Sequence, residues 1–246
     1  MSTSEFIVLP DAAAVAEATA DRFVAAARAA IDERGVLRVA LSGGSTPKAV
    51  YPLLVREPRV ERVDWSRVEW FWGDDRSVPP DDPESNFGVA NDLLLSKLPG
   101  VRPDRVHRMP SDASDLDEAA RAYEATLRRV FDPRDGQPPA FDLIWLGMGP
   151  DGHTASLFPG SEGLGVDDRW VIPNWAPALE TWRMTLTFPV LHAARLVLFV
   201  AAGRDKEPAL RQVRAGEGDL PAGRVHAERV VWLVDEAAAG VQPDST

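Results

Sequence analysis

An acid and a histidine two residues apart are the side chains in this sequence best suited to chemistry. Asp151 and His153 follow a short apolar run, residues 141–146, after a turn rich in glycine. An apolar run of this length without Gly or Pro is typical of a strand buried on both faces of a parallel sheet. Open α/β sheets place their reactive groups at the carboxyl ends of such strands. The pattern therefore favours His153 as a general base, with Asp151 holding its tautomer or helping to bind a water molecule.

Two other interpretations of this turn are open. A single histidine is more often structural than catalytic, although the paired Asp151 and the flanking glycines favour catalysis here. Residues 147–152 also satisfy G-x-G-x-x-G, and Asp167 and Asp168 lie near the distance expected of a ribose-binding acid. That fingerprint opens directly into a helix, whereas this turn contains a proline. We therefore favour a catalytic turn over a dinucleotide site.

Glycines and hydroxyl groups also follow the strand predicted at residues 37–41. They are Ser42, Gly43, Gly44, Ser45 and Thr46. We expect Pro47 at the first position of a helix and Thr46 as its N-cap. Free backbone N–H groups and the helix dipole converge at such a point, so the turn is predicted to bind a phosphate. A plain tight turn is the alternative, and the Walker A pattern is absent.

Cationic side chains follow other predicted strands. Arg76 comes after the strand predicted at 68–72, and we expect it to pair with Asp74 or Asp75 while offering its remaining N–H groups to an oxyanion. A solvated salt-bridge turn is the alternative. A metal site at Asp74 and Asp75 is disfavoured, because no histidine lies near them and hard ions need more oxygen ligands than this loop offers. Lys206 lies near a predicted helix N-terminus, where it opposes the dipole unless an anion binds there too. A solvated lysine is the alternative there.

Composition narrows the classes of function. The chain has 246 residues, 45% of them hydrophobic and 26% charged, which is ordinary for a soluble globular protein. We predict a single domain over residues 1–246 with a disordered tail of a few residues. There are no cysteines, which excludes disulfides and thiol chemistry. The net charge of −11 argues against nucleic-acid and membrane surfaces as partners.

The first residues lack the basic and apolar regions of a signal peptide, and no apolar run is long enough to span a membrane. We therefore expect a cytoplasmic protein, a monomer or weak homo-oligomer. Alternating strands and helices predict a doubly wound α/β fold, with a mostly parallel sheet and helices on both faces. The predicted helices include 11–34, 86–97 and a third up to Phe131 that begins near Ser114; the predicted strands include 141–146, 184–187, 196–202 and 230–234.

Five ordered blocks of this sequence resemble the 6-phosphogluconolactonase family, within the superfamily that also holds glucosamine-6-phosphate deaminase. The blocks are LSGGSTPKAVYPLL, FWGDDRSVPPDDPESNFG, LGMGPDGHTASLFPG, RMTLTFPVLHAAR and GRDKEPAL. The resemblance covers residues from about 37 to 214. It implies a cytoplasmic enzyme of the pentose phosphate pathway that hydrolyses a small-molecule phospho-sugar lactone, 6-phospho-D-glucono-1,5-lactone, without a metal or organic cofactor.

The resemblance also implies roles for individual residues. The turn from Ser42 to Thr46 matches the phosphate loop, and Asp151 and His153 match the catalytic D-G-H. The remaining substrate- or phosphate-binding candidates are Arg76, Lys206, Arg183, Asp74 and Asn86. Two positions depart from the family, with Asp75 where Glu is usual and His192 where Asn often occurs. In the deaminases a glutamate five residues after the turn histidine assists it, and here that position is Phe158.

Overall fold

The computed structural model describes residues 4–134 and 136–241, and its main element is a sheet of six parallel strands. The strand order is β1-β9-β8-β5-β2-β3, and every neighbouring pair is parallel. The strands are β1 (Ser4–Leu9), β2 (Leu37–Leu41), β3 (Val68–Trp72), β5 (Leu143–Gly147), β8 (Leu196–Ala201) and β9 (Arg229–Asp235). The predicted α/β class is confirmed. The tail predicted for the last few residues lies outside the described residues.

The order of the strands changes direction between β2 and β5. From β2 the chain moves outward to β3, then returns to place β5 on the other side of β2. At such a switch point the segments after two adjacent strands diverge and leave a crevice. The segments that diverge here are the glycine turn after Leu41 and the Asp-His turn after Gly147. The topology therefore brings the two predicted sites to one edge of the sheet.

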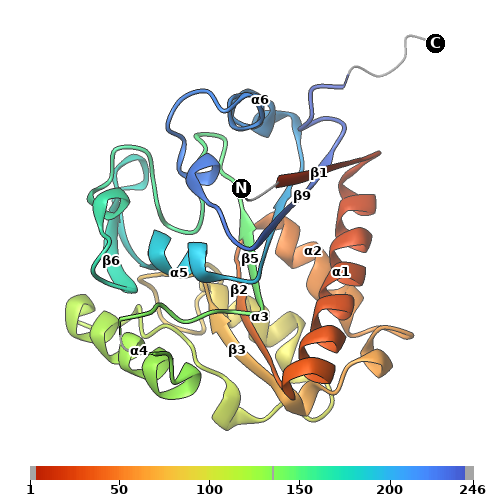
Figure 1. The fold of residues 1–246 in the computed structure, drawn as a ribbon, viewed down its shortest axis with the longest axis vertical. Helices are drawn as coiled ribbons and strands as arrows, with labels where there is room; N and C mark the ends of the chain where they lie inside the picture. The colour runs from red at the N-terminus through yellow and green to blue at the C-terminus, as the bar shows by residue number, and fades with distance from the viewer. Residues whose placement is uncertain (1–3, 135, 242–246) are drawn as a thin grey trace.

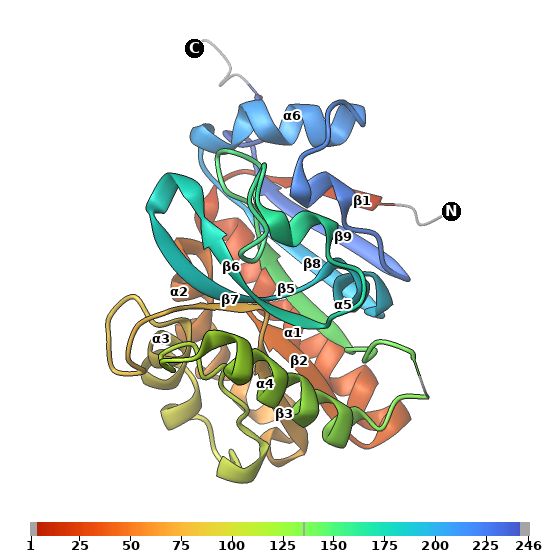
Figure 2. The ribbon, with the colours of Figure 1, turned by 90° about the vertical axis from the view of Figure 1, so that its left-hand side faces the viewer.

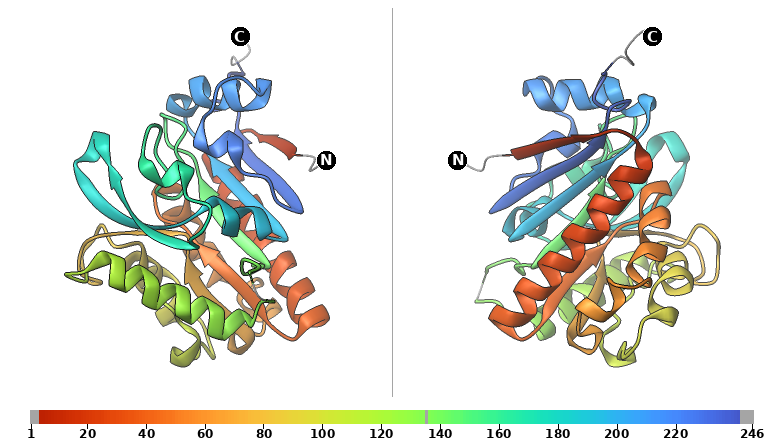
Figure 3. Two further views of the ribbon diagram at one scale, coloured as in Figure 1. Left: turned by 60° about the vertical axis from the view of Figure 1, so that its left-hand side comes forward. Right: turned by 90° about the vertical axis from the view of Figure 1, so that its right-hand side faces the viewer.

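A second, antiparallel sheet was not predicted. It has the order β4-β7-β6 and is formed by β4 (Asp74–Arg76), β6 (Val171–Ala176) and β7 (Thr181–Leu186). The strand predicted at 184–187 therefore belongs to this sheet and begins three residues earlier, at Thr181. Figure 3 shows the β6–β7 hairpin extending along one side of the main sheet. Because β4 follows β3 after one residue, this sheet stands directly beside the crevice.

Helices cover both faces of the main sheet, as predicted (Figures 1 and 2). α1 and α2 lie on one face, and α4 and α5 lie on the side of the second sheet. The α-helices are α1 (Ala12–Arg34), α2 (Ser45–Leu54), α3 (Asn86–Leu93), α4 (Leu116–Phe131), α5 (Phe188–Ala193) and α6 (Glu207–Ala215). None of the described helices is long and apolar enough to cross a membrane.

Three helix boundaries differ from the predictions. α2 begins at Ser45 and is capped by Gly44, whose φ of 99° suits glycine, so Thr46 is not the N-cap. α4 is capped by Asp115, whose carboxylate accepts the N–H of Glu118, and not by Ser114. The α-helix predicted over 86–97 ends at Leu93, and a 3₁₀ turn continues it over Leu95–Lys97.

Candidate active site

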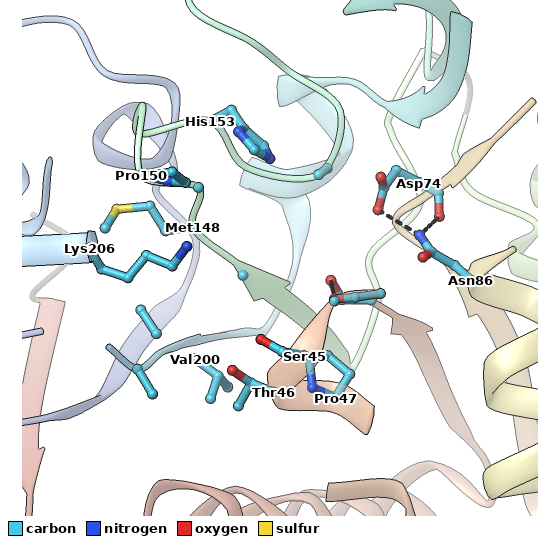
Figure 4. Close-up of a pocket in the computed structure, with 18 of the residues that line it drawn as sticks. Ser45, Thr46, Pro47, Asp74, Asn86, Met148, Pro150, His153, Val200 and Lys206 are labelled. Atoms are coloured by element: carbon cyan, nitrogen blue, oxygen red, sulfur yellow. Dashed lines mark hydrogen bonds between the residues drawn. The ribbon is translucent and has the colours of Figure 1, made fainter. Parts of the chain in front are cut away.

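An open pocket of about 200 Å³ lies at the carboxyl ends of β2, β5 and β8. Every predicted site residue except Asp151 lines it: Ser42, Gly43, Gly44, Ser45, Thr46, Asp74, Arg76, Asn86, His153, Arg183 and Lys206. In the view of Figure 4, Lys206 and His153 lie across the pocket from Asp74 and Asn86, with Ser45 and Thr46 near the start of α2. The pocket thus joins segments that are far apart in the sequence.

Hydrogen bonds within the turn after β5 fix His153. The N–H of Gly149 donates to the carbonyl of His153 over 2.9 Å, and the N–H of Gly152 donates to the carbonyl of Gly149 over 3.0 Å. Gly152 has a φ of 80°, and a Cβ on Gly149 would collide with the imidazole. Glycine is therefore required at both positions. No helix follows directly, which argues against the dinucleotide interpretation.

Asp151 lies outside the pocket lining but holds the imidazole. Its Oδ1 lies 2.6 Å from Nδ1 of His153 and also accepts the backbone N–H of His153 over 3.2 Å. Burial raises the pKa of Asp151, but the hydrogen bond and charge of His153 outweigh it, so the pKa is lowered. An ionised carboxylate only accepts hydrogen bonds, so the proton of a neutral imidazole lies on Nδ1. Nε2 is then the nitrogen that can take a proton from water.

Phe158 packs against the same imidazole. The two ring centroids are 4.4 Å apart, and Phe158 is only 3% exposed. Thr154, between them in the chain, donates its hydroxyl to the carbonyl of Gly147 over 2.8 Å. The aromatic ring occupies the position at which the resemblance places a glutamate in the deaminases, and it can neither orient the imidazole by a hydrogen bond nor share its proton.

Asp74 links two walls of the pocket. Its Oδ2 accepts the hydroxyl of Ser156 over 2.7 Å, and its backbone carbonyl accepts the amide of Asn86 over 2.8 Å (Figure 4). Asn86 in turn fills the space beside Gly43, where a Cβ would collide with its side-chain amide. The glycine turn, β4 and the turn that carries His153 are therefore held together. No role for Ser156 could be predicted, because its partner lies 82 positions away in the sequence.

Asp75 does not pair with the guanidinium of Arg76, and neither does Asp74. Asp75 is 2% exposed and accepts three backbone N–H groups, from Arg76 (2.8 Å), Asn86 (2.7 Å) and Phe87 (3.1 Å). Burial raises its pKa to about 6. The guanidinium of Arg76 instead donates to the carbonyl of Glu84. The predicted Arg–Asp pair was therefore wrong, because Asp75 turns away from the pocket to hold the following loop.

The other cations differ in their partners. Lys206 stands at the N-cap position of α6 without a capping hydrogen bond from its side chain, and it forms an ion pair with Asp205 over 2.9 Å. Arg183, on β7, is half-buried and leaves its buried Nε without a hydrogen-bond partner. His192 does not line the pocket; its ring stacks on that of His226 at 4.0 Å, and burial together with His226 lowers its pKa. Its departure from the family pattern thus lies away from the pocket.

Comparisons with known proteins agree on one family. Residues 10–232 match the family described as glucosamine-6-phosphate isomerases/6-phosphogluconolactonase. A 6-phosphogluconolactonase from Nostoc sp. is 37% identical over 96% of this chain and 96% of its own length. One from Synechocystis sp. is 39% identical over 85% of this chain and 86% of its own. The solved structure of 6-phosphogluconolactonase from Trypanosoma cruzi superposes with a TM-score of 0.85 at 30% identity, covering 98% of this chain and 97% of that one.

Proposed function

The chain belongs to the glucosamine-6-phosphate isomerase/6-phosphogluconolactonase family, and we propose that His153 activates water in its pocket to hydrolyse 6-phospho-D-glucono-1,5-lactone. It is a lactone hydrolase of the pentose phosphate pathway, and the product is 6-phospho-D-gluconate. The observation that carries the mechanism is the 2.6 Å contact between His153 and Asp151 at a pocket that also holds three cations.

The chemistry needs a base and no covalent nucleophile. A six-membered lactone is an activated ester, so a positioned water can attack its carbonyl carbon directly. Nε2 of His153 takes the proton from that water, and Asp151 stabilises the imidazolium that forms. The imidazolium then returns the proton to the ring oxygen as the carbon–oxygen bond breaks. The hydroxyls of Thr154 and Ser156 are engaged in hydrogen bonds with Gly147 and Asp74, which supports water as the nucleophile.

In this proposal the protein binds the substrate mainly through its phosphate group. Ser45 and Thr46 form the first turn of α2, where backbone N–H groups have no partner within the helix. Arg76 and Lys206 line the same pocket and supply positive charge to a chain whose net charge is −11. The phosphate replaces Asp205 as the partner of Lys206. Loss of one charge-assisted contact is expected to weaken binding by about 1.5 to 3 kcal/mol.

Deamination of glucosamine 6-phosphate is the rival activity, and Asp74 is the observation in its favour. Asp74 is a buried carboxylate that lines the pocket and so is placed to move a carbon-bound proton. Against it, Asp74 already accepts hydrogen bonds from Ser156 and Asn86. Phe158 also replaces the glutamate that would assist His153. These contacts favour hydrolysis over isomerisation.

The test is a direct comparison of the two reactions with one preparation. Purified protein is expected to hydrolyse 6-phosphogluconolactone above its spontaneous rate and to release no ammonia from glucosamine 6-phosphate. Ammonia release at a rate equal to lactone hydrolysis would overturn the assignment. The cytoplasmic location and the monomeric or weakly homo-oligomeric state are part of the same proposal, and size-exclusion chromatography with light scattering measures the latter.

A further inference from the structure

The backbone is strained two residues after the general base. Ala155 lines the pocket together with His153, and its φ of 47° lies in the left-handed region that residues with a Cβ rarely adopt. A residue keeps such a conformation only where the surrounding contacts hold it, and strain of this kind is concentrated at active sites. The contacts of the next residue, Ser156, supply that hold.

Two side chains of the second sheet bind the peptide groups of Ser156. The hydroxyl oxygen of Thr185, on β7, accepts the N–H of Ser156 over 3.2 Å, while its own proton is donated to the carbonyl of Leu186 over 3.0 Å. Asn174, on β6, donates its side-chain amide to the carbonyl of Ser156 over 2.7 Å. Thr185 is fully buried and Asn174 is 3% exposed. Neither lines the pocket that holds His153, so neither is placed to touch the substrate.

Asn174 also holds the segment that carries Phe158. Its Nδ2 donates to the hydroxyl of Ser161 over 3.0 Å, and its Oδ1 accepts the N–H of Gly163 over 3.2 Å. The hydroxyl of Ser161 in turn donates to the carbonyl of Phe158 over 2.8 Å. The ring of Phe158 packs on the imidazole of His153, with the centroids 4.4 Å apart. The second sheet is therefore connected to the general base through a fully hydrogen-bonded, buried network.

The orientation of His153 needs this support. Asp151, which contacts its Nδ1, has a side chain that is 44% exposed and belongs to the same turn. Without the contacts on Ser156, the strained Ala155 is expected to relax toward the right-handed region and to shift the chain between His153 and Phe158. A displacement of about 1 Å at a reacting group can cost roughly a hundredfold in rate.

We propose that Asn174 and Thr185 are positioning residues of the hydrolysis, which hold Ser156 so that the imidazole of His153 meets the attacking water. This inference rests on the proposed function and deepens it. The groups that bind the phosphate in that proposal are the glycine turn, Arg76 and Lys206, and none of them lies on β6 or β7. Loss of positioning should therefore lower kcat and leave KM nearly unchanged.

A pair of substitutions at Thr185 tests the inference. Thr185→Val keeps the shape of the side chain but removes its hydroxyl, and kcat is expected to fall by roughly tenfold or more with KM within about twofold of the wild type. Thr185→Ser keeps the hydroxyl and should hold kcat within about threefold of the wild type. Asn174→Ala is a second, independent variant and should lower kcat by roughly ten- to a hundredfold, again with little change in KM. Ile172→Val is the matched control, because it removes one methyl group from a buried side chain of β6 and should change neither constant.

Three results would overturn the inference. The first is a wild-type kcat for either Thr185→Val or Asn174→Ala. The second is an equal loss of kcat in Thr185→Val and Thr185→Ser, or in Ile172→Val, since the two residues would then only support the fold. The third is a loss that appears in KM alone. Failure of the proposed function is a different result, because the wild-type protein itself would then not hydrolyse the lactone above its spontaneous rate.

Discussion

Asp75 is expected to make stability fall as pH rises, in contrast to most carboxylates. It is 2% exposed, and burial outweighs its three backbone N–H donors, so its pKa rises from 3.8 to about 6. The folded protein therefore binds this proton more tightly than the unfolded chain does. The stabilisation is present in full below pH 3.8 and is lost as pH rises through about 6. A shift of about two pKa units corresponds to about 3 kcal/mol.

The assay is urea unfolding of the wild type and Asp75→Asn between about pH 4 and about pH 7.5. Asparagine does not titrate, so the difference in unfolding free energy isolates the buried carboxyl. We expect the wild type to lose about 2 to 3 kcal/mol relative to the variant across this range. Asp81→Asn, at an exposed acid of the same loop, is the control for loss of a carboxylate without burial. A constant difference for Asp75→Asn, or one that grows in favour of the wild type as pH rises, would show that burial does not raise the pKa of Asp75.

Two further substitutions test the links between the pocket walls. Gly43→Ala introduces a Cβ that collides with Asn86, and the displaced turn is expected to raise KM by roughly tenfold. Adding Asn86→Ala removes the colliding side chain and should bring KM part of the way back to the wild-type value. An unchanged KM for Gly43→Ala would contradict this packing. Ser156→Ala removes the hydroxyl that donates to buried Asp74 over 2.7 Å and should lower the unfolding free energy by about 1 to 3 kcal/mol. Ser66→Ala, which removes a hydroxyl from an exposed hydrogen bond, is the control and should lower it by less than about 0.5 kcal/mol. Equal effects of the two serine variants would argue against the buried link.

Much of the main sheet could be predicted because its strands are short, buried apolar runs that end in glycine or polar residues. The strands at 37–41, 68–72 and 196–201 fall within one residue of their predicted ends. β1 gave no comparable signal, since this edge strand pairs only with β9 and is half-exposed. The antiparallel sheet was missed because β4 is three residues long and charged, so its pairing with β7 depends on tertiary contacts.

The pocket could be predicted for a similar reason. Carboxyl ends of parallel strands meet at one edge, so polar residues after β2 and β5 had to converge. The direction of individual side chains could not be predicted. Nothing in the run Asp74-Asp75-Arg76 says that the first acid faces Ser156 while the second faces the backbone of the next loop. That outcome is set by strand alternation in β4, which requires the second sheet to be known.

The kcat of His153→Ala on 6-phosphogluconolactone, measured after subtraction of spontaneous hydrolysis, decides whether His153 is the general base. The side chain is partly exposed and contacts Asp151 at the edge of the turn, so its removal should leave the fold intact. We predict that kcat falls by at least roughly a hundredfold, with KM within about twofold of the wild type, because the general base is lost while the phosphate contacts remain. Wild-type turnover by a correctly folded His153→Ala protein would remove His153 from the mechanism.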